Sequence, residues 1–189
     1  MRDALTTAAR DHPDKRIRLF FQDEARVGQK GRLCHRWWIM GQRPPGLCDQ
    51  RFDWTYLFAA IDPITGDAFA LVMPTVSTKV MQRFLDDFSK MLADDEHAVM
   101  VLDGAGWHAA RSLRVPENMT LVHQPPYSPE CNPVERVWLF LRERFLSLQV
   151  WPDKEAIIKA CCDAWNALVD DPERIQSLCL QPWVRKVIS

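Results

Sequence analysis

Three acidic residues stand in settings where carboxylates could act together. Asp23 lies in the segment FFQDEARVG, Asp103 ends the apolar run VMVLD, and Glu135 follows Asn132-Pro133 closely. Clustered carboxylates repel one another, and divalent cations remove that penalty. Mg²⁺ prefers oxygen ligands and keeps substrate phosphates in its shell, and two such ions can assist both oxygens of a displacement at phosphorus. The pattern therefore predicts a site for two Mg²⁺ or Mn²⁺ ions that acts on phosphodiesters.

Asp23 belongs to a segment that predicts a β-strand. Apolar residues alternate along residues 17–27, and Asp23 falls on the same face as Leu19 and Phe21. A buried carboxylate is costly unless it is paired or binds a metal ion, so Asp23 is either the partner of a buried arginine or a metal ligand. Glu24 points to the opposite face, and we expect it to support the site at most.

Asp103 ends a second predicted strand. Residues 97–103 read HAVMVLD, an apolar run on both faces that is typical of an interior, parallel strand. Ligands of open α/β sheets bind outside the carboxyl ends of strands, and the small residues 104–106 would let a bulky substrate approach. The alternative is a simple Asp-Gly turn. His108 could orient a water molecule, contact a phosphate or serve the structure alone.

Glu135 has a competing structural explanation. The segment Asn132-Pro133-Val134-Glu135 resembles a helix capping box, with Asn132 as N-cap, Pro133 at the first helical position and Glu135 at the third. A glutamate there stabilises a helix start without any chemistry. The preceding YSPE motif and the two other acids favour the functional interpretation.

The elements that must position these acids follow from the pattern along the chain. Period-two alternation and apolar runs predict strands at about 17–27, 34–40, 54–62, 68–74, 97–103 and 120–126. Capping residues and 3–4 spacing predict helices that begin near Ser77, Asn132, Asp153 and Asp171. This order predicts an α/β domain with a mixed five-stranded sheet flanked by helices, as in the ribonuclease H-like fold.

Composition supports one folded domain. The 189 residues are 47% hydrophobic and carry no repeat, no apolar run long enough for a membrane span and no signal peptide. We therefore expect a cytoplasmic protein with reduced cysteines. A zinc site is a weak alternative, because the spacing of the candidate ligands matches no zinc motif: Cys34, His35, Cys48 and His108.

The charge distribution favours a nucleic-acid partner more than the net charge of −1 does. Between residues 26 and 51 a single acid, Asp49, accompanies six basic residues: Arg26, Lys30, Arg32, Arg36, Arg43 and Arg51. We call residues 26–51 the basic segment. It is either an ordinary solvated hairpin or a surface that binds phosphates beside Asp23. Trp37, Trp38 and Trp107 could stack on bases.

Four motifs make the chain resemble the DDE transposases of the mariner-like superfamily, in their bacterial insertion-sequence branch. They are the Asp23-Glu24 pair after an apolar strand, RWWIMGQRPPG at 36–46, DGAGWH at 103–108 and YSPECNPVERVW at 127–138. The last motif is the most specific. The 32-residue spacing from Asp103 to Glu135 is also close to the family's. The resemblance covers about residues 15–150.

The resemblance implies roles for particular residues. Asp23, Asp103 and Glu135 would form the catalytic triad and hold two Mg²⁺ or Mn²⁺ ions. The reaction would be hydrolysis at transposon ends followed by attack of the freed 3′-hydroxyl on target DNA. Double-stranded DNA would be the partner, contacted through Lys30, Arg32, Arg36, Arg43 and His108, and the protein would act as a homo-oligomer beside the bacterial nucleoid.

Two departures from the family pattern qualify these expectations. Cys131 stands where an aliphatic residue is usual, and no helix-turn-helix region precedes Ile17. We therefore expect residues 1–15 to be a linker or the remnant of a DNA-binding region, and residues 16–189 to be the catalytic domain. The alternatives are a ribonuclease H-like nuclease without strand transfer and an inactive, transposase-derived remnant that binds DNA.

Overall fold

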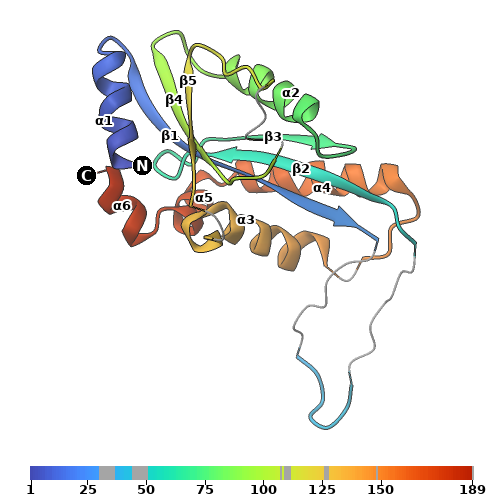
Figure 1. Ribbon diagram of the computed structural model, residues 1–189. Coiled ribbons are helices and arrows are strands. Elements are labelled where there is room, and N and C mark those ends of the chain that lie inside the picture. Colours follow the sequence, from blue (N-terminus) through green and yellow to red (C-terminus); the bar gives the residue numbers. More distant parts are fainter. Residues whose placement is uncertain are drawn as a thin grey trace.

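A mixed β-sheet forms the centre of the molecule. The computed structural model describes residues 1–29, 37–43, 51–106, 108, 112–125, 128–147 and 149–188 (Figure 1). Within this part of the chain, five strands pair in the order β3-β2-β1-β4-β5. Their bounds are β1 (Arg16–Gly28), β2 (Trp54–Ile61), β3 (Ala68–Met73), β4 (Glu96–Leu102) and β5 (Met119–His123). The first three are antiparallel and β4 and β5 run parallel to β1, which is the sheet of a ribonuclease H-like fold.

Helices cover both faces of the sheet. Helix α2 (Thr78–Ser89) lies on one face, and the remaining helices lie on the other (Figure 1). Those are α1 (Arg2–Asp11), α3 (Val134–Leu141), α4 (Lys154–Val169), α5 (Pro172–Cys179) and α6 (Pro182–Ile188). A 3₁₀ turn, η1 (Pro129–Cys131), precedes α3, and a π-helical segment, η2 (Arg142–Leu146), continues it. No helix of the described ranges is both long and apolar enough to cross a membrane.

The period-two pattern of β1 divides the core in two. Leu19 and Phe21 join Val99 and Val101 of β4 in the cluster beneath α3–α6, whereas Phe20 packs against α2 on the other face. Every residue of β4 is buried, which confirms the prediction of an interior, parallel strand. Because side chains alternate across a strand, Asp23 shares the face of Phe21 and of α3.

Side-chain caps begin the helices where the sequence predicts them. Ser77 accepts a hydrogen bond from the Val80 amide, and Asp153 accepts one from the Ala156 amide. Asp171 caps α5 in the same way, and Pro172 occupies its first turn. Gly66, with φ of +80°, makes the turn between β2 and β3 against Pro172 of α5, where a Cβ would lie 2.4 Å from a carbonyl oxygen. The turn and the helix start thus fix each other's place.

The structure corrects three details of the predicted elements. Helix α3 begins at Val134 with Pro133 as N-cap, so Glu135 is its second residue and the proposed capping box is wrong. Residues 37–40 form no strand, and residues 34–36 of that predicted strand lie outside the described residues. Helix α6 was not expected, because its seven residues carry no capping signal that distinguishes them from a loop.

The N-terminal segment packs on the sheet. Residues 2–11 form α1, whose Ala8 is buried in the core cluster beneath α3–α6. Arg2 donates a hydrogen bond to the Lys186 carbonyl in α6 over 2.5 Å, so the two ends of the chain lie side by side (Figure 1). This segment therefore belongs to the packed body. Whether it once joined a DNA-binding region stays a prediction.

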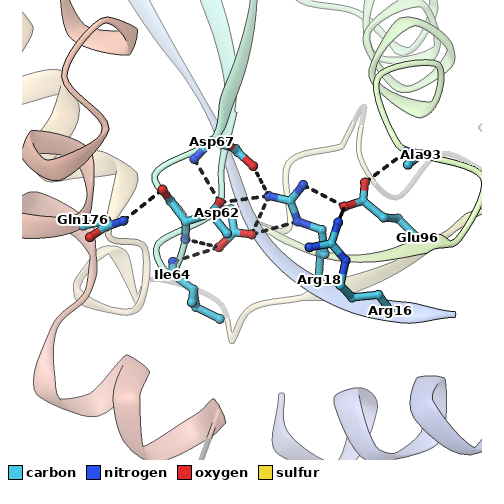
Figure 2. A network of polar contacts seen from close by, with 9 residues as sticks. Arg16, Arg18, Asp62, Ile64, Asp67, Ala93, Glu96 and Gln176 are labelled. Atoms are coloured by element: carbon cyan, nitrogen blue, oxygen red, sulfur yellow. Dashed lines mark hydrogen bonds and ion pairs between the residues drawn. The ribbon is translucent and has the colours of Figure 1, made fainter.

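A charged network is buried near the amino end of β1. The Arg18 guanidinium donates to Asp62 over 2.7 Å, to Asp67 over 2.7 Å and to Glu96 over 3.1 Å (Figure 2). The Arg18, Asp62 and Glu96 side chains are only 9%, 2% and 4% exposed. Burial of such charges is tolerated because each carboxylate faces the guanidinium. Arg16 also pairs with Glu96.

Candidate active site

Asp23, in the carboxyl half of β1, and Asp103, just beyond the end of β4, stand at the same level of two adjacent parallel strands. The last registered pair between β1 and β4 is Phe21 with Val101, and each acid is two residues beyond it. Asp23 extends from the face that carries α3, and Asp103 follows β4 at the same level of the sheet. The predicted position of Asp103, outside the carboxyl end of an interior strand, is where open α/β sheets bind ligands.

Helix α3 brings Glu135 to the same end of the sheet. The Trp138 indole donates a hydrogen bond to Asp23 Oδ2 over 2.9 Å, and Glu135 precedes Trp138 by three residues, close to one helical turn. Asn132, buried before the helix, donates to the Gln22 carbonyl over 3.1 Å and accepts from the Val134 amide. One end of α3 is thus tied to the strand residue that precedes Asp23.

The crowding of acids is visible in the pKa of Asp23. Burial, followed by the nearby charge of Glu135, raises the pKa of Asp23 from 3.8 to about 7. Hydrogen bonds from the Trp138 indole and the Glu24 amide oppose this rise without cancelling it. The buried arginine that could have neutralised Asp23 pairs instead with Asp62, Asp67 and Glu96. Asp23 is therefore a carboxylate that gains from a nearby cation.

His108 connects Asp103 to Glu24. Its Nδ1 lies 2.6 Å from Asp103 Oδ1, and its Nε2 lies 3.3 Å from Glu24 Oε2. Although burial disfavours the imidazolium, the two carboxylates outweigh it and raise the pKa of His108. The residue is 2% exposed, so this placement favours an orienting role over a direct contact with a phosphate.

The two strand acids differ in access. Asp103 keeps 53% of its side chain exposed, although its Oδ1 also accepts a hydrogen bond from the Ala105 amide over 2.9 Å. Glu135 is exposed, and Asp23 is partly buried. Among the described residues, no three His, Cys, Asp or Glu side chains already surround one point at ligand distance. The acids supply oxygen donors of the kind that Mg²⁺ and Mn²⁺ prefer, and the charge of Glu135 on α3 acts on Asp23 in β1.

Most of the predicted DNA-contacting residues lie outside the described residues. These are Lys30, Arg32 and Arg36, together with Trp107. Of the remainder, Arg43 is exposed, as are Trp37 and Trp38. The base of the basic segment is anchored, because Arg51 donates to the Trp151 and Pro152 carbonyls, and the Gln29 amide side chain also donates to Trp151.

The chain belongs to the DDE superfamily endonucleases. The model of that family matches residues 18–158, a range that contains Asp23, Asp103 and Glu135. A relative from Sinorhizobium fredii (strain NBRC 101917 / NGR234), called "Uncharacterized protein y4pE/y4sA", is 44% identical over 133 residues. That match covers 70% of this chain and 98% of the relative.

Solved structures of similar fold are complexes of the Mos1 mariner transposase, which agrees with the mariner-like resemblance of the motifs. The Mos1 strand transfer complex has a TM-score of 0.61 at 18% identity and covers 94% of this chain and 58% of Mos1. The Mos1 paired end complex with Mn has a TM-score of 0.62 at 16% identity, with 93% and 59% covered. The chain thus spans somewhat more than half of the length of Mos1 in these structures.

Sequence reasoning missed the partners of the acids. Trp138 ends the last motif, and nothing in the sequence analysis indicated that its indole donates a hydrogen bond to Asp23. The contact between His108 and Glu24 joins two motifs that stand 84 positions apart, and no local pattern encodes it. The three-residue spacing from Glu135 to Trp138 was a usable signal, because residues at that spacing lie on one side of a helix.

Proposed function

We propose that this chain is the catalytic domain of a transposase that cleaves DNA at transposon ends and joins the freed 3′-hydroxyl to target DNA. One observation carries the proposal. Asp103 follows β4 level with Asp23 in the adjacent, parallel β1, and α3, bonded to Asp23 through Trp138, carries Glu135, whose charge raises the pKa of Asp23. Membership of the DDE superfamily endonucleases supports it.

The three acids would hold two divalent metal ions. All their donors are carboxylate oxygens, and the raised pKa of Asp23 reflects repulsion that a cation would relieve. Bound Mg²⁺ or Mn²⁺ would supply activation of the attacking oxygen and charge stabilisation at the leaving one. The Mn named with the Mos1 paired end complex supports this choice of metal.

The protein's own part in the reaction is to hold and orient. The Trp138 indole and the Glu24 amide fix both oxygens of Asp23, while the Ala105 amide and His108 fix one oxygen of Asp103. In the first step water attacks phosphorus at the transposon end, and the 3′-oxygen leaves. In the second step that 3′-hydroxyl attacks a target phosphodiester and displaces its 3′-oxygen, without a covalent enzyme intermediate.

DNA would be held beside this site by the basic segment. Lys30, Arg32, Arg36 and Arg43 would contact phosphates, in a homo-oligomer assembled on paired ends, in the bacterial cytoplasm where the nucleoid lies. Replacing Arg32 and Arg36 by Gln should weaken binding to a DNA duplex and flatten its salt dependence by about 0.9 per lost phosphate contact. An unchanged slope would show that the DNA surface lies elsewhere.

Two alternatives make different predictions. A ribonuclease H-like nuclease would cleave but never join ends, so a product assay with preprocessed 3′-hydroxyl ends separates it from a transposase. An inactive remnant would bind DNA without metal and would be indifferent to Asp103→Asn. The intact acids in three separate motifs favour the active enzyme.

The decisive experiment is a calorimetric Mn²⁺ titration of the purified chain, with and without a short DNA duplex, beside its Asp103→Asn variant. We expect binding by the parent and a large loss in the variant, which would establish a carboxylate metal site. An absence of Mn²⁺ binding by the parent under both conditions would contradict the proposed function.

A further inference from the structure

The Asp103 carboxylate is held from the protein side through one oxygen. Its Oδ1 receives the Ala105 amide over 2.9 Å and lies 2.6 Å from His108 Nδ1. Among the described residues, its Oδ2 accepts no hydrogen bond, and 53% of the side chain is exposed. The carboxylate plane is therefore set by contacts on one side, which leaves its other side toward solvent.

His108 is itself held in place. The ring is 2% exposed, and beyond Asp103 it meets Glu24, whose Oε2 lies 3.3 Å from Nε2. Glu24 receives a further hydrogen bond from the Gln22 side-chain amide over 3.2 Å. The backbone amide of Glu24 donates to Asp23, so Glu24 contacts Asp23 directly and contacts Asp103 through His108. A ring with a carboxylate at each nitrogen has no freedom to flip without losing a contact.

We infer that His108, oriented by Glu24, is a positioning residue that presents Asp103 to the metal ions. This inference rests on the proposed function. It concerns His108 and Glu24, which would orient the metal ligand Asp103 without contacting the metal ions themselves. Outer partners of this kind fix ligand orientation, and their loss typically costs about 10- to 100-fold in metal affinity. The chain thereby couples the DE pair of β1 to the aspartate that follows β4.

Two substitutions of His108 each retain one of the two contacts that its imidazole ring makes. The amide nitrogen of Asn at position 108 would lie near the former Nδ1 and keep the donor toward Asp103. The amide nitrogen of Gln would lie near the former Nε2 and keep only the contact with Glu24. Both variants remove the imidazole from the same buried site, so a purely structural role predicts similar consequences for both.

The test measures Mn²⁺ affinity by calorimetry on the full chain with a DNA duplex, together with thermal melting, for the parent, His108→Asn and His108→Gln. We expect an affinity within a few-fold of the parent for His108→Asn and a loss of about 10- to 100-fold for His108→Gln. Parent-like affinity in His108→Gln, or equal losses in both variants that follow their melting temperatures, would overturn the inference.

Glu24→Gln keeps the inference testable should either His108 variant fail to fold. It removes the charge that orients the ring and should weaken Mn²⁺ binding by a few-fold, as the loss of the same contact does in His108→Asn, whereas an unchanged affinity would overturn the role of Glu24. If the parent itself binds no Mn²⁺, the proposed function fails and this inference fails with it. Strong binding by the parent with no effect of these variants refutes the inference alone.

Discussion

Carboxylates lie around β1 in two places, near its amino end and in its carboxyl half, and the two groups differ in whether a cation of the protein faces them. Near the amino end, the guanidinium of Arg18 lies among Asp62, Asp67 and Glu96 (Figure 2). In the carboxyl half of the strand, the pKa of Asp23 is raised to about 7 by burial and by the charge of Glu135. Its described hydrogen-bond donors are a neutral indole and a backbone amide.

This difference separates a structural network from a candidate active site. A buried acid that faces a cation of the protein is already satisfied, and its charge is part of the folded state. An acid that is crowded by other acids stores repulsion, which a metal ion from solution can relieve. Acidic side chains lie around both parts of the strand, so their presence alone does not distinguish the structural network from the candidate active site. The groups that face the carboxylates distinguish the two.

The largest expected effect is the loss of activity when Asp23 or one of the two other candidate acids is replaced. Asp23→Asn, Asp103→Asn and Glu135→Gln should each reduce DNA cleavage by at least about a thousandfold, because groups that act as a unit fail together. The unfolding midpoints of the Asp23 and Glu135 variants in urea should stay at or above that of the parent, since each of these two changes removes repulsion. Asp103→Asn weakens the ion pair with His108, so its midpoint should not exceed that of the parent. A variant that cleaves as well as the parent would remove that residue from the triad.

A change at the amino end should do the reverse. Arg18→Met leaves Asp62 buried without its cationic partner and leaves Glu96 with Arg16 alone, and it should cost about 3–5 kcal/mol of unfolding free energy in urea. The cleavage rate per folded molecule should be close to that of the parent. Arg10→Met, at an exposed ion pair with Asp11, is the control and should leave the midpoint unchanged. Equal midpoints for both variants would show that the buried network is not stabilising.

The stability of the metal-free protein should fall as the pH rises from about 4 to about 7. In that range the folded protein holds a proton on Asp23. In the unfolded chain the pKa of Asp23 is 3.8, so that proton has been released. The stabilisation that this proton gives to the folded state is lost progressively as the pH rises, and it amounts to at most about 4 kcal/mol of unfolding free energy. Unfolding at pH 5 and pH 8 measures it, and Asp23→Asn should flatten the difference. Saturating Mn²⁺ should stabilise the parent more at pH 8 than at pH 5.

The smallest effect should come from the indole of Trp138. Trp138→Phe keeps an aromatic ring in the core but removes the hydrogen bond to Asp23, which is worth about 1 kcal/mol. Mn²⁺ affinity should therefore fall by several-fold, and calorimetry should detect it. Trp165→Phe, a buried tryptophan of α4, is the matched control for loss of packing. Equal metal affinities in these two variants would mean that the indole does not orient Asp23.

Much of the fold could be predicted because the strands and helices follow from patterns among residues that are close in the sequence. The alternation around Asp23 predicted β1, the run before Asp103 predicted β4, and Ser77 and Asp153 predicted helix starts. The start of α3 was placed one residue too early, at Pro133. No pattern in the sequence indicated that the Asn132 side chain donates to the Gln22 carbonyl of β1 while its oxygen accepts from the Val134 amide. A local capping rule cannot anticipate a partner 110 positions away.

The sequence by itself determined the candidate residues for the chemistry, which are the acids in their three motifs. It also determined the strands and helix near which they lie and the family to which the chain belongs. Only the tertiary structure decided how those acids are held. It assigned Arg18 to the other end of β1, Trp138 to Asp23, and His108 to both Asp103 and Glu24. The physical reason is that period and capping act between neighbours along the chain, whereas the pairing of a buried charge depends on which groups folding leaves within reach.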